Sequence, residues 1–120
     1  MSSITRFNID SRQRMLTVEL SETATWEFPM EYLRVIDLNG ITTNAKQTLV
    51  TNKKEVQLNN IESVGKHGYR LCFDDNYQVI LNEQEFKQLH AQQETLWLAY
   101  LDAIKNSGLT RETAIDIKAL

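Results

Sequence analysis

The chain has 120 residues, of which 42% are hydrophobic and 24% are charged, and its formal net charge is −3. These values are those of an ordinary globular protein, long enough for one domain whose core needs no disulfide or metal. The Lys and Arg residues form no basic stripe. We therefore expect neither nucleic acid nor an anionic membrane surface as the partner.

The cysteine count and the first residues bear on location. Cys72 is the only cysteine, so an intrachain disulfide is impossible, and we interpret it as a small strand residue. No apolar run approaches the roughly 20 residues of a membrane-spanning helix. The first ten residues contain no apolar core of a signal peptide. We expect a cytoplasmic protein.

The N-terminal third predicts strands and a short helix. Residues 3–9 are a candidate first strand. Met15–Leu20 alternates apolar and polar residues and, with Thr25–Phe28, predicts a hairpin. Pro29 stops that hairpin and is well placed in the first turn of a helix over Pro29–Ile36. Three residues of this helix are expected to face the core: Tyr32, Leu33 and Ile36.

Asp37–Asn52 is the least patterned stretch. Asn39–Gly40 is a turn signal, and the rest is rich in Thr and Asn. We expect a long connection with a little strand near Thr48–Val50.

Three strand patterns follow and predict an antiparallel meander: Glu55–Val64, Tyr69–Asp74 and Tyr77–Leu81. The alternation in the first one slips at Asn59–Asn60, which indicates a bulge. Gly65–Gly68 and Asp75–Asn76 form the two turns. In the middle strand the core-facing residues are predicted to be Tyr69, Leu71 and Phe73.

The C-terminal third is helical. Asn82 and Glu85 resemble a capping box at the start of a long apolar period of three and four. A break is expected within the letters HAQQE, and Gly108 is expected to end the helix. A last short helix is predicted over Arg111–Leu120. The fold class is therefore α+β, an antiparallel β-sheet (hairpin plus three-stranded meander) packed with a short helix and a long C-terminal helical segment, in one domain over residues 1–120.

Few residues point to chemistry. His67 and His90 have no companion at a metal-ligand spacing, so we interpret them as a turn residue and a helix-surface residue. Asp74 and Asp75 point to opposite sides of a strand end and favour a turn, with a weak cation site of oxygen ligands as the alternative. No catalytic, metal or cofactor-binding residue is predicted.

Arg34 is the charge that stands out, because it lies between the apolar residues Leu33 and Val35. An arginine in that setting commonly ties a loop through hydrogen bonds to carbonyl or carboxylate oxygens. We expect that structural role here.

Three segments resemble one family: WEFPMEYLRV, VQLNNIESVGKHGYRLCFDDNY and ILNEQEFKQL, the last followed by LWLAYLDAI. The resemblance extends over roughly Leu16–Ile104 and is to the gamma-butyrobetaine hydroxylase-like N-terminal domain, which also occurs as small stand-alone bacterial proteins. It implies an accessory module. In relatives this module precedes the oxygenase domain of gamma-butyrobetaine and trimethyllysine dioxygenases, or is fused to P-loop iron–sulfur carriers.

The resemblance also implies where relatives bind zinc, through cysteines after the letters LR and a histidine after the second hairpin turn. Here Val35–Lys46 contains no cysteine, Tyr77 stands at the histidine position, and Asn76 stands where relatives have glycine. We therefore expect no zinc. We expect no oxygenase activity either, since the iron-binding histidines and aspartate belong to a domain that this sequence does not include.

The sequence supports a non-catalytic accessory or protein-interaction module, with a protein partner and a possible link to iron–sulfur or oxygenase metabolism. The candidate interaction surface is Arg34, Asp74, Asp75 and Tyr77, together with the connection at 37–52. One alternative is a small metal- or ligand-binding protein or enzyme with a site between sheet and helix. Another is a purely structural subunit.

Overall fold

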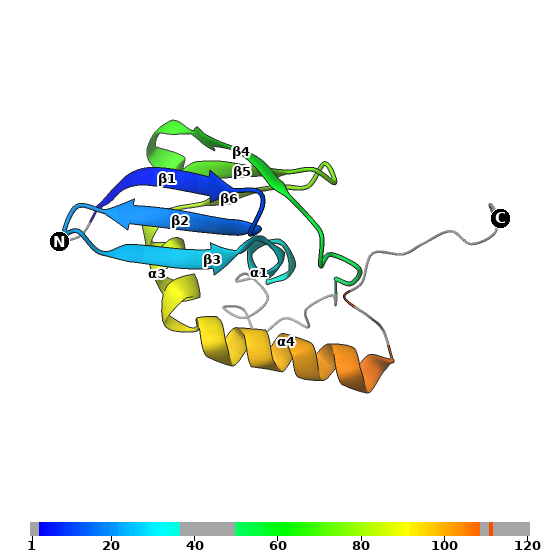
Figure 1. Cartoon of the computed structure of the whole chain (residues 1–120). Coiled ribbons are helices and arrows are strands. Elements are labelled where there is room, and N and C mark those ends of the chain that lie inside the picture. Colours follow the sequence, from blue (N-terminus) through cyan, green and yellow to red (C-terminus); the bar gives the residue numbers. More distant parts are fainter. Residues whose placement is uncertain (1–2, 37–49, 109–110, 112–120) are drawn as a thin grey trace.

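The computed structural model describes residues 3–36, 50–108 and 111, and for His67 only the main chain. These residues form two three-stranded antiparallel sheets, a short helix and two C-terminal helices, which confirms the predicted α+β class (Figure 1). The predicted connection at 37–52 lies mostly outside the described residues, as does the predicted helix after Arg111.

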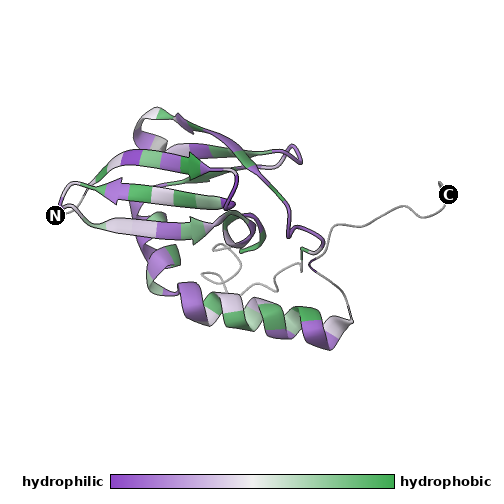
Figure 2. Ribbon diagram, in the orientation of Figure 1, coloured by the Kyte–Doolittle hydropathy of each residue, from purple (hydrophilic) through white to green (hydrophobic). Residues whose placement is uncertain are grey.

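The first sheet has the order β1-β2-β3, with β1 at Ile4–Asp10, β2 at Met15–Leu20 and β3 at Thr25–Pro29. The predicted hairpin is thus joined by a third strand, because the candidate strand β1 pairs with β2 along its length. Hydrophobic and hydrophilic residues alternate along these strands (Figure 2). Leu16, Val18 and Leu20 are buried, so one face of the sheet forms core.

Helix α1 (Met30–Val35) follows β3 without a loop, because Pro29 is both the last residue of the strand and the N-cap of the helix. Its φ of −61° is the value that the proline ring imposes, and this value suits the entry to a helix. Tyr32 and Leu33 are buried as predicted, whereas Ile36 is only partly buried. Arg34 lies in the last turn of α1.

The second sheet has the order β4-β5-β6, with β4 at Leu58–Ser63, β5 at Tyr69–Phe73 and β6 at Gln78–Leu81. The predicted bulge is confirmed by a register shift between Leu58 and Asn60. Two predicted strand starts were too early. The chain still turns at Val56, whose N–H donates to Lys53 O over 3.1 Å, and Tyr77 belongs to the turn that precedes β6.

The turn between β4 and β5 contains a short 3₁₀ helix at Gly65–His67 and ends at Gly68, whose φ is 118°. A side chain at Gly68 would collide with the carbonyl oxygen of Leu81. Glycine is therefore needed there for both conformation and space, as the hairpin interpretation of these glycines predicts.

The C-terminal helices are α3 (Glu83–Ala91) and α4 (Gln93–Ser107), separated at Gln92 within the predicted break. The capping box is confirmed, because Asn82 Oδ1 accepts from Glu85 N–H over 2.8 Å and Glu85 Oε1 accepts from Asn82 N–H over 3.0 Å. Gly108 ends α4 with a left-handed φ of 75°. None of the helices in the described part of the chain is long and apolar enough to span a membrane.

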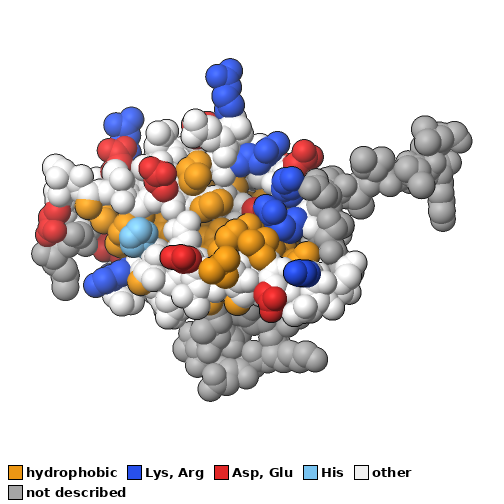
Figure 3. Space-filling model, turned by 60° about the horizontal axis from the view of Figure 1, so that its bottom comes forward, with side chains coloured by type: hydrophobic (Ala, Val, Ile, Leu, Met, Phe, Trp, Pro, Cys, Tyr) orange, Lys and Arg blue, Asp and Glu red, His pale blue; other side chains and the backbone are white. Residues whose placement is uncertain are grey.

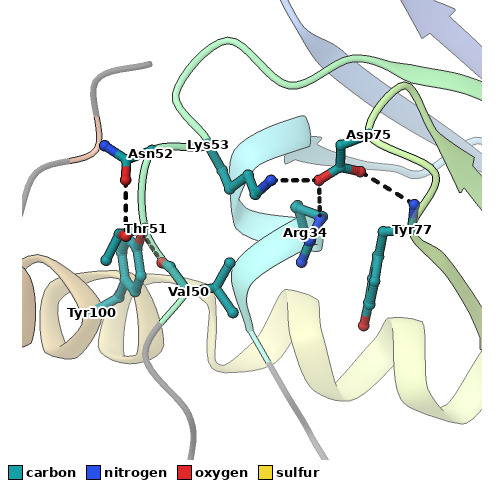
Figure 4. A network of polar contacts seen from close by, with 8 residues as sticks. All are labelled: Arg34, Val50, Thr51, Asn52, Lys53, Asp75, Tyr77 and Tyr100. Carbon is teal, nitrogen blue, oxygen red and sulfur yellow. Dashed lines mark hydrogen bonds and ion pairs between the residues drawn. The ribbon is translucent and has the colours of Figure 1, made fainter. Parts of the chain in front are cut away.

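The core lies between the two sheets and is completed by helices. Strand β1 lies beside β4, and α3 packs against the β3 side (Figure 1). Phe86 and Leu89 of α3 join the buried strand residues Phe28 and Leu71 in one cluster. The last turn of α1 and the β5–β6 turn lie next to each other, and the candidate surface lies where they meet (Figure 4).

Candidate functional site

The β5–β6 turn holds Asp75 in a fixed position. Phe73 N–H donates to Tyr77 O over 2.9 Å and Asn76 N–H donates to Phe73 O over 3.2 Å, which closes the turn. Asn76 has a φ of 68°, a left-handed conformation that asparagine tolerates better than most residues. Within this turn Asp75 Oδ1 accepts from Tyr77 N–H over 3.3 Å. The turn thereby uses one carboxylate oxygen of Asp75, and the other oxygen binds residues outside the turn.

That second oxygen, Asp75 Oδ2, binds two cations from different segments (Figure 4). Arg34 Nε lies 2.8 Å away and Lys53 Nζ lies 2.7 Å away. The side chains are 12% exposed for Arg34, 25% for Lys53 and 21% for Asp75. Partly buried charge-assisted bonds of this kind are stronger than surface ion pairs. Asp75 therefore joins α1, the segment at 50–53 and the β5–β6 turn.

The guanidinium of Arg34 also stacks on Tyr77. Its Cζ atom lies 3.9 Å from the centroid of the tyrosine ring, within the range of a cation–π contact. The other neighbour of that ring is Phe73, at 5.9 Å between centroids. Tyr77 still exposes 36% of its surface. Arg34 and Tyr77 therefore form a stacked pair in which Asp75 fixes the arginine and the tyrosine is accessible to solvent.

The environment of Asp75 favours its charged form. Burial pushes its pKa upward, but hydrogen bonds from Lys53 and Arg34, the charge of Arg34 and the bond from Tyr77 N–H outweigh burial, and the pKa is lowered. A carboxylate whose oxygens are already occupied by three donors is a poor general base. The arrangement is suited to holding structure and presenting Arg34 and Tyr77.

Three of the four predicted surface residues thus come together, and Asp74 lies apart from them. Asp74 is exposed, and its N–H donates to Gln57 O over 2.9 Å. It borders a shallow depression of about 300 Å³, lined by Asn52, Lys53, Glu55, Val56, Asp74 and Asp75. Both aspartates line this depression, and Asp75 is the one that binds Arg34 and Lys53.

A second polar cluster, which the sequence did not suggest, lies between α1 and α4. Glu31 is buried, and both of its carboxylate oxygens accept from Arg111, at 2.9 Å from Nε and 2.8 Å from Nη2. Arg111 also lies over the ring of Trp97, at 5.1 Å from its centroid. Nearby, Tyr100 Oη donates to Val50 O over 2.7 Å. These contacts bind Arg111 to helix α1 and Val50 to helix α4.

The remaining predicted residues do not assemble into a reactive centre. Cys72 is partly buried, and His90 is exposed and stacks on Trp26 at 5.4 Å between ring centroids. The side chain of His67 lies outside the described residues. Within residues 3–36, 50–108 and 111, no three His, Cys, Asp or Glu side chains lie close enough to hold a metal ion.

One depression lies between sheet and helix, where the alternative function would require a site. Its volume is about 420 Å³, and it opens at the junction of α3 and α4. It is lined by Pro29, Tyr32, His90, Ala91, Gln93, Glu94 and Trp97. Tyr32 is not available for chemistry there, since its hydroxyl donates to Leu89 O over 2.7 Å and burial raises its pKa.

Comparison with known proteins places the fold. The family model described as gamma-butyrobetaine hydroxylase-like, N-terminal, matches residues 7–82, which is more than half of the chain. The chain belongs to this family. The matched region runs from β1 to the N-cap of α3 and includes Arg34, Asp75 and Tyr77. No curated protein matches the sequence.

Solved structures with the same fold are of two kinds. An NMR solution structure shares 26% identity with a TM-score of 0.76, covering 98% of this chain and 90% of its own. Another shares 22% identity with the same TM-score of 0.76, covering 100% and 98%. A crystal structure of a protein of unknown function from Acidithiobacillus ferrooxidans, of the DUF971 family, shares 21% identity with a TM-score of 0.59, covering 73% and 92%.

Proposed function

We propose that this chain is a non-catalytic accessory module that binds another protein, and that Arg34 and Tyr77 are the anchors of the binding surface. The observation that carries the proposal is the stacked Arg34–Tyr77 pair, held on Asp75 and open to solvent on the tyrosine. Arginine and tyrosine are among the residues most enriched at the energetic centres of protein interfaces.

Preorganisation supports this role. Immobilising a long side chain on binding costs about 0.5–1.5 kcal/mol, and here Arg34 is already fixed by Asp75 and by the tyrosine ring. Lys53 braces the same carboxylate from the opposite segment. A partner that contacts Arg34 and Tyr77 therefore meets a surface that needs little ordering.

The perturbed acid–base groups support a structural interpretation over a catalytic one. The pKa of Asp75 is lowered by its ion pairs, which removes it as a base. The pKa of Tyr100 is raised, mainly by burial and then by the charge of Glu31, although the charge of Arg111 acts in the opposite direction. The hydroxyl of Tyr100 donates to Val50 O. Each of these groups is committed to a contact between chain segments.

Membership of the family suggests the setting. Its name refers to an N-terminal region of gamma-butyrobetaine hydroxylase. We infer that the partner is a cytoplasmic protein, in oxygenase or iron–sulfur metabolism. The second candidate function, a small ligand-binding protein, is favoured by two depressions between the first sheet and the helices, one of about 420 Å³ between β3 and the α3–α4 junction and one of about 370 Å³ beside the start of α3.

The test is affinity purification from the native host with matched variants. Tyr77→Ala removes the anchor, and Leu98→Ala removes an apolar side chain on α4 that is more exposed, at 56% against 36% for Tyr77. Hydrophobic side chains gather on the face turned forward in Figure 3. The second variant tests whether an exposed apolar side chain away from the Arg34–Tyr77 pair is enough for binding.

A partner retained by wild type and by Leu98→Ala but lost with Tyr77→Ala supports the proposal. A partner lost only with Leu98→Ala, or a stoichiometric small molecule or metal in the purified protein, contradicts it.

A further inference from the structure

Three of the four sheet edges carry features that block the addition of another strand. Strand β1 has a register shift between Ile4 and Arg6, and β4 has one between Leu58 and Asn60. Strand β3 ends in Pro29. Bulges, charges and prolines are the usual means by which proteins protect edge strands from pairing.

The fourth edge, β6, carries none of these features. Its sequence, QVIL, contains no charge and no proline, and its pairing with β5 is regular over all four residues. It is the outer strand of its sheet. Ile80, on the face of the sheet that does not form core, exposes 45% of its surface.

The register determines which main-chain groups of β6 are open. Phe73 N–H bonds to Tyr77 O, so the bonded pairs of this hairpin continue at Val79 and Leu81. In an antiparallel ladder the intervening residues direct their N–H and C=O groups away from the partner strand. Those residues are Gln78 and Ile80, and no hydrogen bond to another described segment engages their main chain.

This open edge is continuous with the proposed binding surface, because Tyr77 directly precedes β6. Arginine carries five N–H donors, and only its Nε bond to Asp75 is made among the described residues. A carboxylate accepts the remaining donors best, since it matches the guanidinium in a two-bond geometry. Main-chain pairing beside Gln78 and Ile80 and a carboxylate at Arg34 can therefore come from one extended segment.

We propose that the partner binds by adding an extended segment as a fourth strand beside β6, with an apolar residue against Ile80 and an Asp or Glu against Arg34. The inference rests on the proposed protein-binding function and specifies its mode. Strand addition obtains affinity from main-chain hydrogen bonds and specificity from alternate side chains.

The test uses linear peptides selected from a random display library against the wild-type protein. In the free protein the amide hydrogens of Gln78 and Ile80 are expected to exchange fast and those of Val79 and Leu81 to be protected, because only the latter two face β5. The selected peptide is expected to protect Gln78 and Ile80 as well. Replacing its acidic residue by the corresponding amide is expected to weaken binding by about tenfold, the equivalent of about 1.4 kcal/mol.

Ile80→Pro deletes an outward N–H without removing a bond to β5, a position where edge strands tolerate proline. It is expected to lower the affinity for the peptide by about tenfold or more. Ile80→Val keeps the N–H and is expected to bind the peptide as the wild type does. If Ile80→Pro does not fold, the amide hydrogen exchange of Gln78 and Ile80 in the complex of wild-type protein and peptide decides whether a strand is added.

The outcomes separate the two proposals. Peptides that need Tyr77 but leave the amides of Gln78 and Ile80 exchanging fast overturn strand addition and leave the protein-binding function intact. Failure to select any peptide that protects these amides also overturns strand addition. The protein-binding function itself is tested separately, by the affinity purification that compares Tyr77→Ala with wild type.

Discussion

Replacing Asp75 by asparagine tests whether one carboxylate joins three segments of the fold. The substitution keeps the shape and an oxygen for Tyr77 N–H but removes the charge that binds Arg34 and Lys53. A hydrogen bond to a charged group contributes about 1.5–3 kcal/mol, and the more exposed Lys53 pair belongs at or below the lower end. We expect the free energy of unfolding to fall by about 2–4 kcal/mol, because the poorly exposed Arg34 also loses its counter-charge.

Urea unfolding at neutral pH measures this loss. With an m-value of about 1.5 kcal/mol per M, the midpoint should move down by about 1–3 M. The matched control is Asp74→Asn, which changes the same charge at an exposed neighbour and should stay within about 0.5 kcal/mol of wild type. Equal stability of the two variants would refute the role assigned to Asp75.

The pH dependence of the same experiment has a defined sign. The pKa of Asp75 is lowered in the folded protein, so its ionised form is favoured more in the folded than in the unfolded state. The stabilisation is therefore complete above the pKa of an unfolded aspartate, about 3.9, and is lost as the pH falls through the folded pKa. The gap between wild type and Asp75→Asn should accordingly be constant near neutrality and narrow below about pH 4. A gap that widens on acidification would contradict the reasoning.

Four further substitutions, at three places in the structure, test the fold. Phe73→Ala should lower the free energy of unfolding by about 3–5 kcal/mol in urea, because the side chain is buried in the core; a loss under about 1 kcal/mol would mean that the strand face is assigned wrongly. Arg111→Ala should lower the free energy of unfolding by about 2–4 kcal/mol, and by more than Glu31→Gln does. The reason is that Arg111→Ala leaves a carboxylate that is 7% exposed without its partner, whereas Glu31→Gln leaves an arginine that is 33% exposed and can reach water. The reverse order of stability in urea unfolding of the two variants would contradict this. Gly68→Ala should lower the thermal midpoint, because its methyl group would meet Leu81 O at a φ of 118°, and an unchanged midpoint would show that the turn relaxes freely.

The parts of the fold that the sequence predicts are those specified by neighbouring residues. The alternation of β2 determines its buried face, and the capping box places the start of α3, since both patterns act within a few residues. Strand β1 was only a candidate because a register shift between Ile4 and Arg6 interrupts its short alternation.

The candidate site is less predictable because its contacts are distant in sequence. Arg34 was singled out by its apolar neighbours, and its expected structural role is confirmed by the bond to Asp75. Lys53 has no such signal, since it lies in a polar stretch and its partner Asp75 is 22 residues away in the sequence. Glu31 was missed for the same reason, because Arg111, the residue that pairs with its buried carboxylate, lies 80 residues away.

The shared carboxylate of Asp75 also bears on how the chain tolerates changes in length. Arg34 precedes, and Lys53 follows, the stretch at 37–49, and both are fixed to the same oxygen. The folded body therefore sets the distance that this stretch must bridge, whatever its length. Closing a loop twice as long costs only about 0.6 kcal/mol more in chain entropy. A longer connection between Arg34 and Lys53 is accordingly expected to cost little stability as long as both side chains keep their bonds to Asp75.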